Sequence, residues 1–196
     1  MRQAARTYCY DWYLAALLAP RPARADLIAL AAFAGEVGRI PSLVSEPMMG
    51  AIRLQWWRDA LSGSSASSTA STGHPVADRI RAIAARHPTA LASMTALIDA
   101  QEVELQPVPP DDLHALTIHF DKNWGSLIRL SARVLDSERT ELSEELVGKA
   151  ASAYGLAVLS CELAAGVRQG QLLVPPEFTT RYDCPLDELR TAPGSP

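Results

Sequence analysis

The segment from Ser45 to Leu61, SEPMMGAIRLQWWRDAL, constrains the fold of this chain more than any other stretch. Ser45 can accept a hydrogen bond from a first-turn amide, and Pro47 is tolerated where a helix has no amide partner to lose. Two apolar stripes follow at helical spacing, Met48, Ile52 and Trp56 in one and Leu54, Trp57 and Leu61 in the other. A helix with two such stripes is expected to be buried on more than one side. The segment therefore predicts a central helix of an all-helical protein.

The rest of the chain also favours helices separated by proline and glycine breaks. Helical segments are expected at 10–19, 24–37, 76–86, 89–106, 111–135 and 142–167, with Asp111 or Asp112 as the cap of the fifth. No stretch of useful length alternates with a period of two, so no sheet is expected. The prediction is an all-α, single-domain bundle of roughly six to eight helices over residues 1–178. The polar segment 62–73 is expected to be a flexible loop, and 179–196 a C-terminal tail.

Composition excludes several classes of function. The net charge of −4 argues against nucleic acid as the main partner. The three cysteines are far apart and form no zinc-ligand spacing or disulfide framework. The apolar run near the N-terminus is short for a secretory signal, so a cytoplasmic location is the default prediction. Peripheral contact with a membrane stays open.

Three places in the chain could carry function, at 36–42, 99–104 and 162–175. Asp99 and Glu102 are three residues apart on one helical face, a spacing that can present oxygen ligands to a divalent cation. A solvated acidic face is the commoner meaning of such a pair. Trp56 and Trp57 together most often mean core packing.

These places, in this order on a helical background, resemble the squalene/phytoene synthase family. The segments that carry the likeness are DWYLAALLAPRPARADLIALAAFAGEVGRI, SEPMMGAIRLQWWRDAL, LIDAQEVEL, LTIHFDKNWGSLIRLSARVL and YGLAVLSCELAAGVRQGQLLVPPEF. The resemblance implies the all-α isoprenoid synthase fold. It also implies head-to-head joining of two prenyl diphosphates, with Mg²⁺ held by two aspartate-rich motifs on facing helices.

The chain departs from both motifs that the resemblance implies. The first motif falls at 38–42, where Gly38, Arg39 and Ser42 stand and no carboxylate is present. In the second motif Glu162 takes the place of the first acid, Ala165 and Gly166 replace the later acids, and the flanking Arg168 survives. Family members continue for several more helices past this point, so a C-terminally shortened bundle is expected.

The missing acids favour a branch of the family without prenyl transfer, similar to the mitochondrial assembly factors for respiratory complex I. The leading hypothesis is a catalytically silent fold relative that needs no cofactor and binds a protein partner, a lipid or an isoprenoid. Its retained binding surface would include Arg53, Trp56, Trp57 and Arg58. The alternative is an active Mg²⁺-dependent prenyltransferase that uses Glu162, Asp99 and Glu102 as metal ligands, with Arg168 beside the diphosphate. A structural remnant without a ligand is the third hypothesis.

Overall fold

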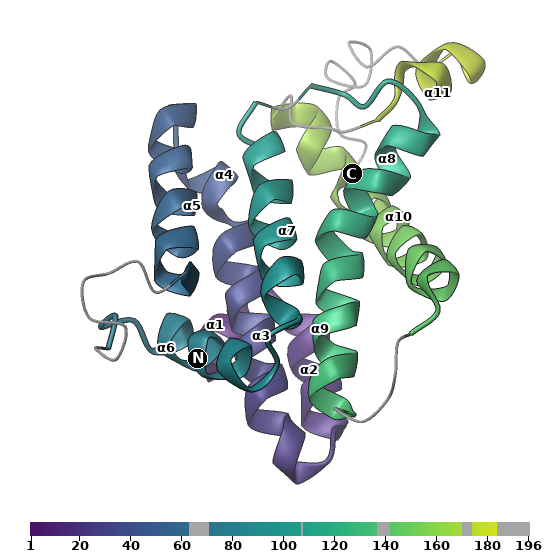
Figure 1. Ribbon diagram of the computed structural model, residues 1–196. Helices are drawn as coiled ribbons and strands as arrows, with labels where there is room; N and C mark the ends of the chain where they lie inside the picture. The colour runs from purple at the N-terminus through teal and green to yellow at the C-terminus, as the bar shows by residue number, and fades with distance from the viewer. Residues whose placement is uncertain (63–70, 107, 137–141, 170–173, 184–196) are drawn as a thin grey trace.

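The computed structural model describes residues 1–62, 71–106, 108–136, 142–169 and 174–183, with the side chains of Glu162 and 164–169 left aside. These residues form helices and contain no β-strand, which confirms the all-α prediction for this part of the chain (Figure 1). The elements are α1 Arg2–Tyr8, α2 Tyr10–Leu18, α3 Arg21–Gly38, α4 Ile40–Leu43, α5 Pro47–Ser62, α6 Pro75–Arg86, α7 Ala90–Val103, α8 Leu113–Phe120, the π-helical turn η1 Asp121–Gly125, α9 Ser126–Leu135, α10 Glu144–Gln169 and α11 Pro176–Arg181.

Helix α3 is the central element of the bundle. It packs against α1, α2, α6, α7 and α9, and nearly all of its residues from Asp26 to Val37 are buried. Its many alanines allow these neighbours to approach closely, while Leu30 and Phe33 fill the space between them. The helix predicted at 24–37 is thus confirmed, and it holds the position that the pattern had assigned to the Ser45 segment.

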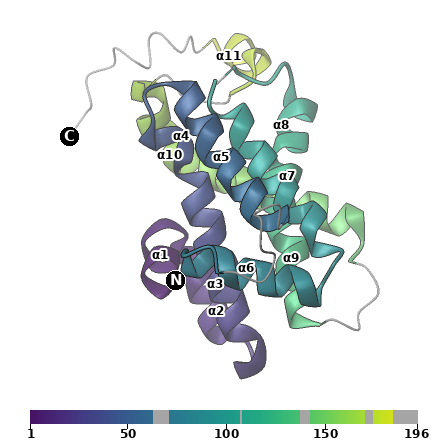
Figure 2. The same cartoon turned by 60° about the vertical axis from the view of Figure 1, so that its left-hand side comes forward.

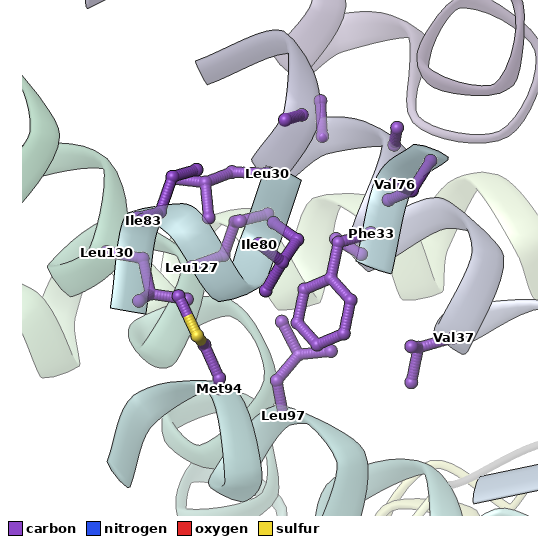
Figure 3. Packing of buried hydrophobic residues seen from close by; sticks show 14 of the residues in the cluster. Leu30, Phe33, Val37, Val76, Ile80, Ile83, Met94, Leu97, Leu127 and Leu130 are labelled. Atoms are coloured by element: carbon purple, nitrogen blue, oxygen red, sulfur yellow. The ribbon is translucent and has the colours of Figure 1, made fainter. Parts of the chain in front are cut away.

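The core lies where four helices face one another, α3, α6, α7 and α9. Figure 3 shows Leu30 and Phe33 of α3 pointing toward Ile80 and Ile83 of α6, with Leu97 of α7 closing the cluster from the other side. These side chains are almost completely shielded from water. Burial of each such side chain contributes roughly 1.5–3 kcal/mol to folding, so this cluster holds the framework on which the other helices are placed.

Helix α5 lies at one edge of the bundle, and the prediction that it is central was wrong. Only one of its two stripes is buried, the one formed by Leu54, Trp57 and Leu61, which faces α6 and α7. Met48 is 75% exposed, Ile52 57% and Trp56 41%. In Figure 2 this edge comes forward, with α4 beside α5. The helix begins at Pro47, two residues after the expected cap Ser45.

The helix predicted at 111–135 is confirmed in outline, with a π-helical turn in the middle. Asp112 caps its start by accepting a hydrogen bond from the Ala115 amide at 2.7 Å. Both α8 and the turn η1 pack against α10, and Gly155 of α10 faces the ring of Phe120 at the end of α8. The segment predicted at 89–106 ends as a helix at Val103, and the short helices α1, α4 and α11 were not predicted.

Two predicted segments fall largely outside the described residues. Of the expected loop at 62–73, Ser62 ends α5, Thr72 donates to Asp78 at 2.8 Å, and 63–70 are not described. Of the expected tail at 179–196, residues up to Arg181 belong to α11 and 184–196 are not described. Within the described residues, we find no helix whose length and apolar character would let it cross a bilayer.

Candidate functional site

A groove of about 560 Å³ opens between α1, the end of α3, α4 and the outer side of α5. Because α5 is an edge helix, one wall of this groove is open to solvent. The walls combine apolar, aromatic and cationic side chains. They are Tyr8, Glu36, Arg39, Ile40, Leu43, Arg53, Trp56, Trp57 and His74.

The two adjacent tryptophans occupy different environments, because successive helix positions point about 100° apart. Trp57 is 4% exposed and packs edge-on against Phe33 of the core, with ring centroids 5.2 Å apart. Trp56 stands on the solvent side and meets Trp57 edge-on at 5.1 Å. His74 completes the cluster at 5.4 Å from Trp56 and 5.3 Å from Trp57. Of the two tryptophans in the predicted binding surface, Trp57 is therefore mainly a core residue that borders the groove, and Trp56 is the exposed one.

A side-chain contact joins two residues of the groove, Glu36 of α3 and His74, with His74 Nε2 3.3 Å from Glu36 Oε2. Burial raises the pKa of Glu36, while nearby positive charge, including that of Arg39, opposes that shift. The Nδ1 atom of His74 accepts from the Ala77 amide at 3.4 Å, which ties the imidazole to the start of α6. The pair thus joins α3 to the segment that precedes α6.

The position of the first metal motif in the resembled family carries a cation in this chain. Gly38 ends α3, and Arg39 follows with its guanidinium carbon 4.0 Å from the centre of the Tyr8 ring. Such a cation–π contact is attractive and holds the guanidinium against the Tyr8 ring. Ser42 donates its hydroxyl to the carbonyl oxygen of Arg39 at 2.9 Å and so holds the start of α4. These residues favour an anion and repel a metal ion.

Asp99 and Glu102 lie together on α7, as predicted, but an arginine of α5 lies between them. Arg58 Nη2 is 2.7 Å from Asp99 Oδ1, and the same nitrogen contacts Glu102 Oε2. Partial burial acts to lower the pKa of Arg58, but the hydrogen bonds to both carboxylates outweigh it and raise that pKa. The two carboxylates are half exposed, at 52% and 50%, so the three groups form a surface link between α5 and α7.

The residues that the structure describes do not fit a Mg²⁺ cluster. Mg²⁺ requires near-octahedral oxygen ligands, and in this part of the chain no group of three or more His, Cys, Asp or Glu could hold a metal ion. The only predicted carboxylate pair is engaged by Arg58. Glu162 and Arg168 belong to α10, and their side chains lie outside the described residues.

Sequence reasoning placed Glu36 in a candidate region but missed Tyr8 and His74 as its neighbours. The histidine-proline pair at 74–75 is a local signal for a helix start, because Pro75 is favoured in the first turn. That signal indicates a cap. It gives no indication that the same imidazole reaches Glu36, which is distant in the sequence.

Comparison with known proteins assigns the chain to a family. The squalene/phytoene synthase profile matches residues 5–196, so the chain belongs to that family. Among curated proteins, "NADH dehydrogenase (ubiquinone) complex I, assembly factor 6" from Bos taurus is 27% identical over 126 residues. The proteins of that name from Homo sapiens and Rattus norvegicus are 25% and 28% identical over the same length.

These matches cover 64% of this chain and 37% of each relative, so they span little more than a third of the relatives' length. No solved structure matches the chain significantly.

Proposed function

We propose that this chain is a non-catalytic member of the squalene/phytoene synthase family that acts by binding a protein partner, as an assembly factor of the kind its curated relatives are named for. The observation that carries this proposal is the Arg58 link. A metal shell built on Asp99 and Glu102 would need oxygen atoms of both carboxylates, and Arg58 already forms an ion pair with each of them. The names of the relatives, which refer to assembly of complex I, support the same role.

The residues of the groove also support the absence of prenyl transfer. Diphosphate departure requires that its charge be neutralised, usually by Mg²⁺ in this family, and the carboxylates that would hold the metal are absent at 38–42. Arg39 brings a positive charge to that corner and holds it against Tyr8. Such a corner attracts anions and needs no metal to do so, which suits binding better than prenyl transfer.

The first experiment tests for catalysis directly. The purified chain is incubated with farnesyl or geranylgeranyl diphosphate and Mg²⁺, and released diphosphate is measured beside an active family member as the positive control. We expect no release above buffer for the wild type. The Arg58→Ala variant frees both carboxylates, and we expect it to gain weak Mg²⁺ binding by calorimetry without turnover. Robust release by the wild type would show an active prenyltransferase and end the proposal.

The second experiment tests the assembly role. The gene is deleted in its host, and the amount of assembled NADH dehydrogenase is measured on native gels by in-gel activity. We expect a loss that the wild-type chain restores. Normal assembly in the deletion strain would contradict the assembly role, whatever the result of the catalytic test.

A further inference from the structure

The outer side of α5 is an apolar surface that folding of the described residues does not explain. Met48, Ile52 and Trp56 recur every four residues along this side, and all three are exposed. Met49 and Leu43 continue the surface toward the groove, at 51% and 45% exposure. No described element lies beyond α5 on this edge (Figure 1). We call these five residues the α5 face.

The composition of the α5 face and its rim is that of a protein interface. Interface cores are enriched in aromatic residues, methionine and arginine, and depleted in lysine and acidic residues. Tyrosine, tryptophan and arginine also dominate the residues that carry binding energy. Here Trp56, Tyr8, Arg39 and Arg53 all line the same groove. We infer that the α5 face and this groove bind an amphipathic helix of a partner protein that carries acidic residues along one flank of its apolar side.

The positive charges of Arg39 and Arg53 beside the α5 face favour a partner helix with an acidic flank. Arg53 is exposed, and among the described residues no carboxylate lies within ion-pair distance of it. Arg39 is held by the Tyr8 ring, and the nearest groove carboxylate, Glu36, is paired with His74. Both guanidinium groups are therefore available to an incoming carboxylate, and a pair formed at such a rim favours partners of the matching charge.

The dimensions suit one helix. Trp56 is eight helical steps after Met48, which corresponds to about 12 Å along α5 at 1.5 Å per residue. An apolar stripe of about two turns on a partner helix matches this length, and the groove beside it gives the helix a concave seat.

Charge disfavours two other ways of covering the α5 face, a second copy of this chain and an anionic membrane. In a twofold dimer centred on Ile52, Arg53 would approach its own copy, since such an interface brings the same patch together. On an anionic membrane, the exposed acids Glu46 and Asp59 at the two ends of the α5 face would be pressed against like charges. A partner helix avoids both conflicts because its charges can be placed to match.

The binding test uses a synthetic helical peptide of about 15 residues, since shorter helices are marginal in water. It carries leucines at i, i+4 and i+8 and glutamates on one flank, and a second peptide has lysine in place of each glutamate. Fluorescence anisotropy with the full chain is expected to show at least about tenfold tighter binding of the glutamate peptide. Arg53→Glu is expected to remove that preference, and Ile52→Glu to weaken binding about tenfold or more.

The matched control is Leu146→Glu, which places the same charge on an exposed leucine of α10 and is expected to bind as the wild type does. Thermal melts followed by circular dichroism confirm that each variant is folded. Absence of binding at about 1 mM glutamate peptide overturns the inference. So does equal binding of both peptides. Binding to anionic vesicles that Ile52→Glu abolishes, or dimerisation in the ultracentrifuge that Ile52→Glu abolishes, assigns the face to another occupant and also overturns it.

This inference rests on the proposed function for the identity of its partner, and the deletion strain separates the two. Ile52→Glu is expected to fail where the wild type restores assembly, and Leu146→Glu is expected to succeed. If Ile52→Glu restores assembly fully, the α5 face is the wrong surface while the assembly role stands. If the deletion has no effect on assembly, the assembly role fails, and the peptide measurements still decide whether the face binds an acidic helix.

Discussion

Glycine-to-alanine changes along α10 are expected to alter stability in opposite directions at two positions. Gly155 faces the ring of Phe120 so closely that an added Cβ would lie 2.5 Å from ring atoms Cγ and Cδ1. Gly148 lies in the same helix, two turns earlier, and an added Cβ there meets nothing within 4 Å. Both changes raise helix propensity by the same amount, so the difference in stability between the two variants measures the packing at Gly155.

The magnitudes follow from two opposing effects. Alanine in place of glycine stabilises a helix interior by about 1 kcal/mol. At Gly155 the new methyl group must displace the ring of Phe120, which is buried, and overpacking of this kind costs about 1–3 kcal/mol. Gly148→Ala is therefore expected to raise the free energy of unfolding by about 1 kcal/mol. Gly155→Ala is expected to lower it by about 1–2 kcal/mol, the overpacking cost less the propensity gain.

Urea unfolding followed by circular dichroism measures both changes. If the slope of the unfolding free energy against urea concentration is the same in each variant, the two-state comparison is valid. The double variant Gly155→Ala/Phe120→Leu supplies the internal check. Leucine lacks the aromatic ring that the new methyl group would meet, so this second change should recover part of the stability lost in Gly155→Ala. If Gly155→Ala proves as stable as Gly148→Ala, the close approach of α10 to the end of α8 is refuted, and with it the placement of the helix that carries the second motif.

Three further outcomes are expected. Burial raises the pKa of Glu36, so its contribution to stability is present at low pH and lost as the pH rises through that pKa; Glu36→Gln should gain stability relative to the wild type as the pH rises above the ordinary range of a glutamate, measured by urea titrations. Asp26, with a side chain 4% exposed, lies 2.5 Å from Arg79 and 2.7 Å from Arg86; Asp26→Ala should cost about 3 kcal/mol of unfolding free energy, and a loss below about 1 kcal/mol would contradict the buried pairing. Burial raises the pKa of Cys9 to about 12, so alkylation at mild alkaline pH should label exposed Cys161 much faster than Cys9 by peptide mass spectrometry.

Local patterns in the sequence predicted the helices well, because helix formation depends on spacing and breaks that lie within one segment. The helix at 24–37 and the Asp112 cap are examples. Periodicity could not say which apolar stripe would be covered, since that depends on neighbours distant in the sequence. The stripe at Met48, Ile52 and Trp56 has the same helical spacing as the buried one, yet it is exposed in the described structure. No local signal connects Arg58 to Asp99, 41 residues away, or Glu36 to His74.

Packing within the described bundle accounts for only one of the two apolar stripes of α5. Leu54 and Trp57 are buried against the core, and Gly50 allows Leu105 to approach α5, so these residues are required for the bundle to form. Met48, Ile52 and Trp56 gain little burial from the packing of the described residues, and large exposed apolar side chains carry a risk of aggregation unless something covers them. Replacing them with polar residues would leave the buried stripe intact. Because no described residue covers this stripe and Arg39 and Arg53 lie along the adjoining groove, the partner helix inferred above accounts for the half of α5 that packing within the described bundle does not require.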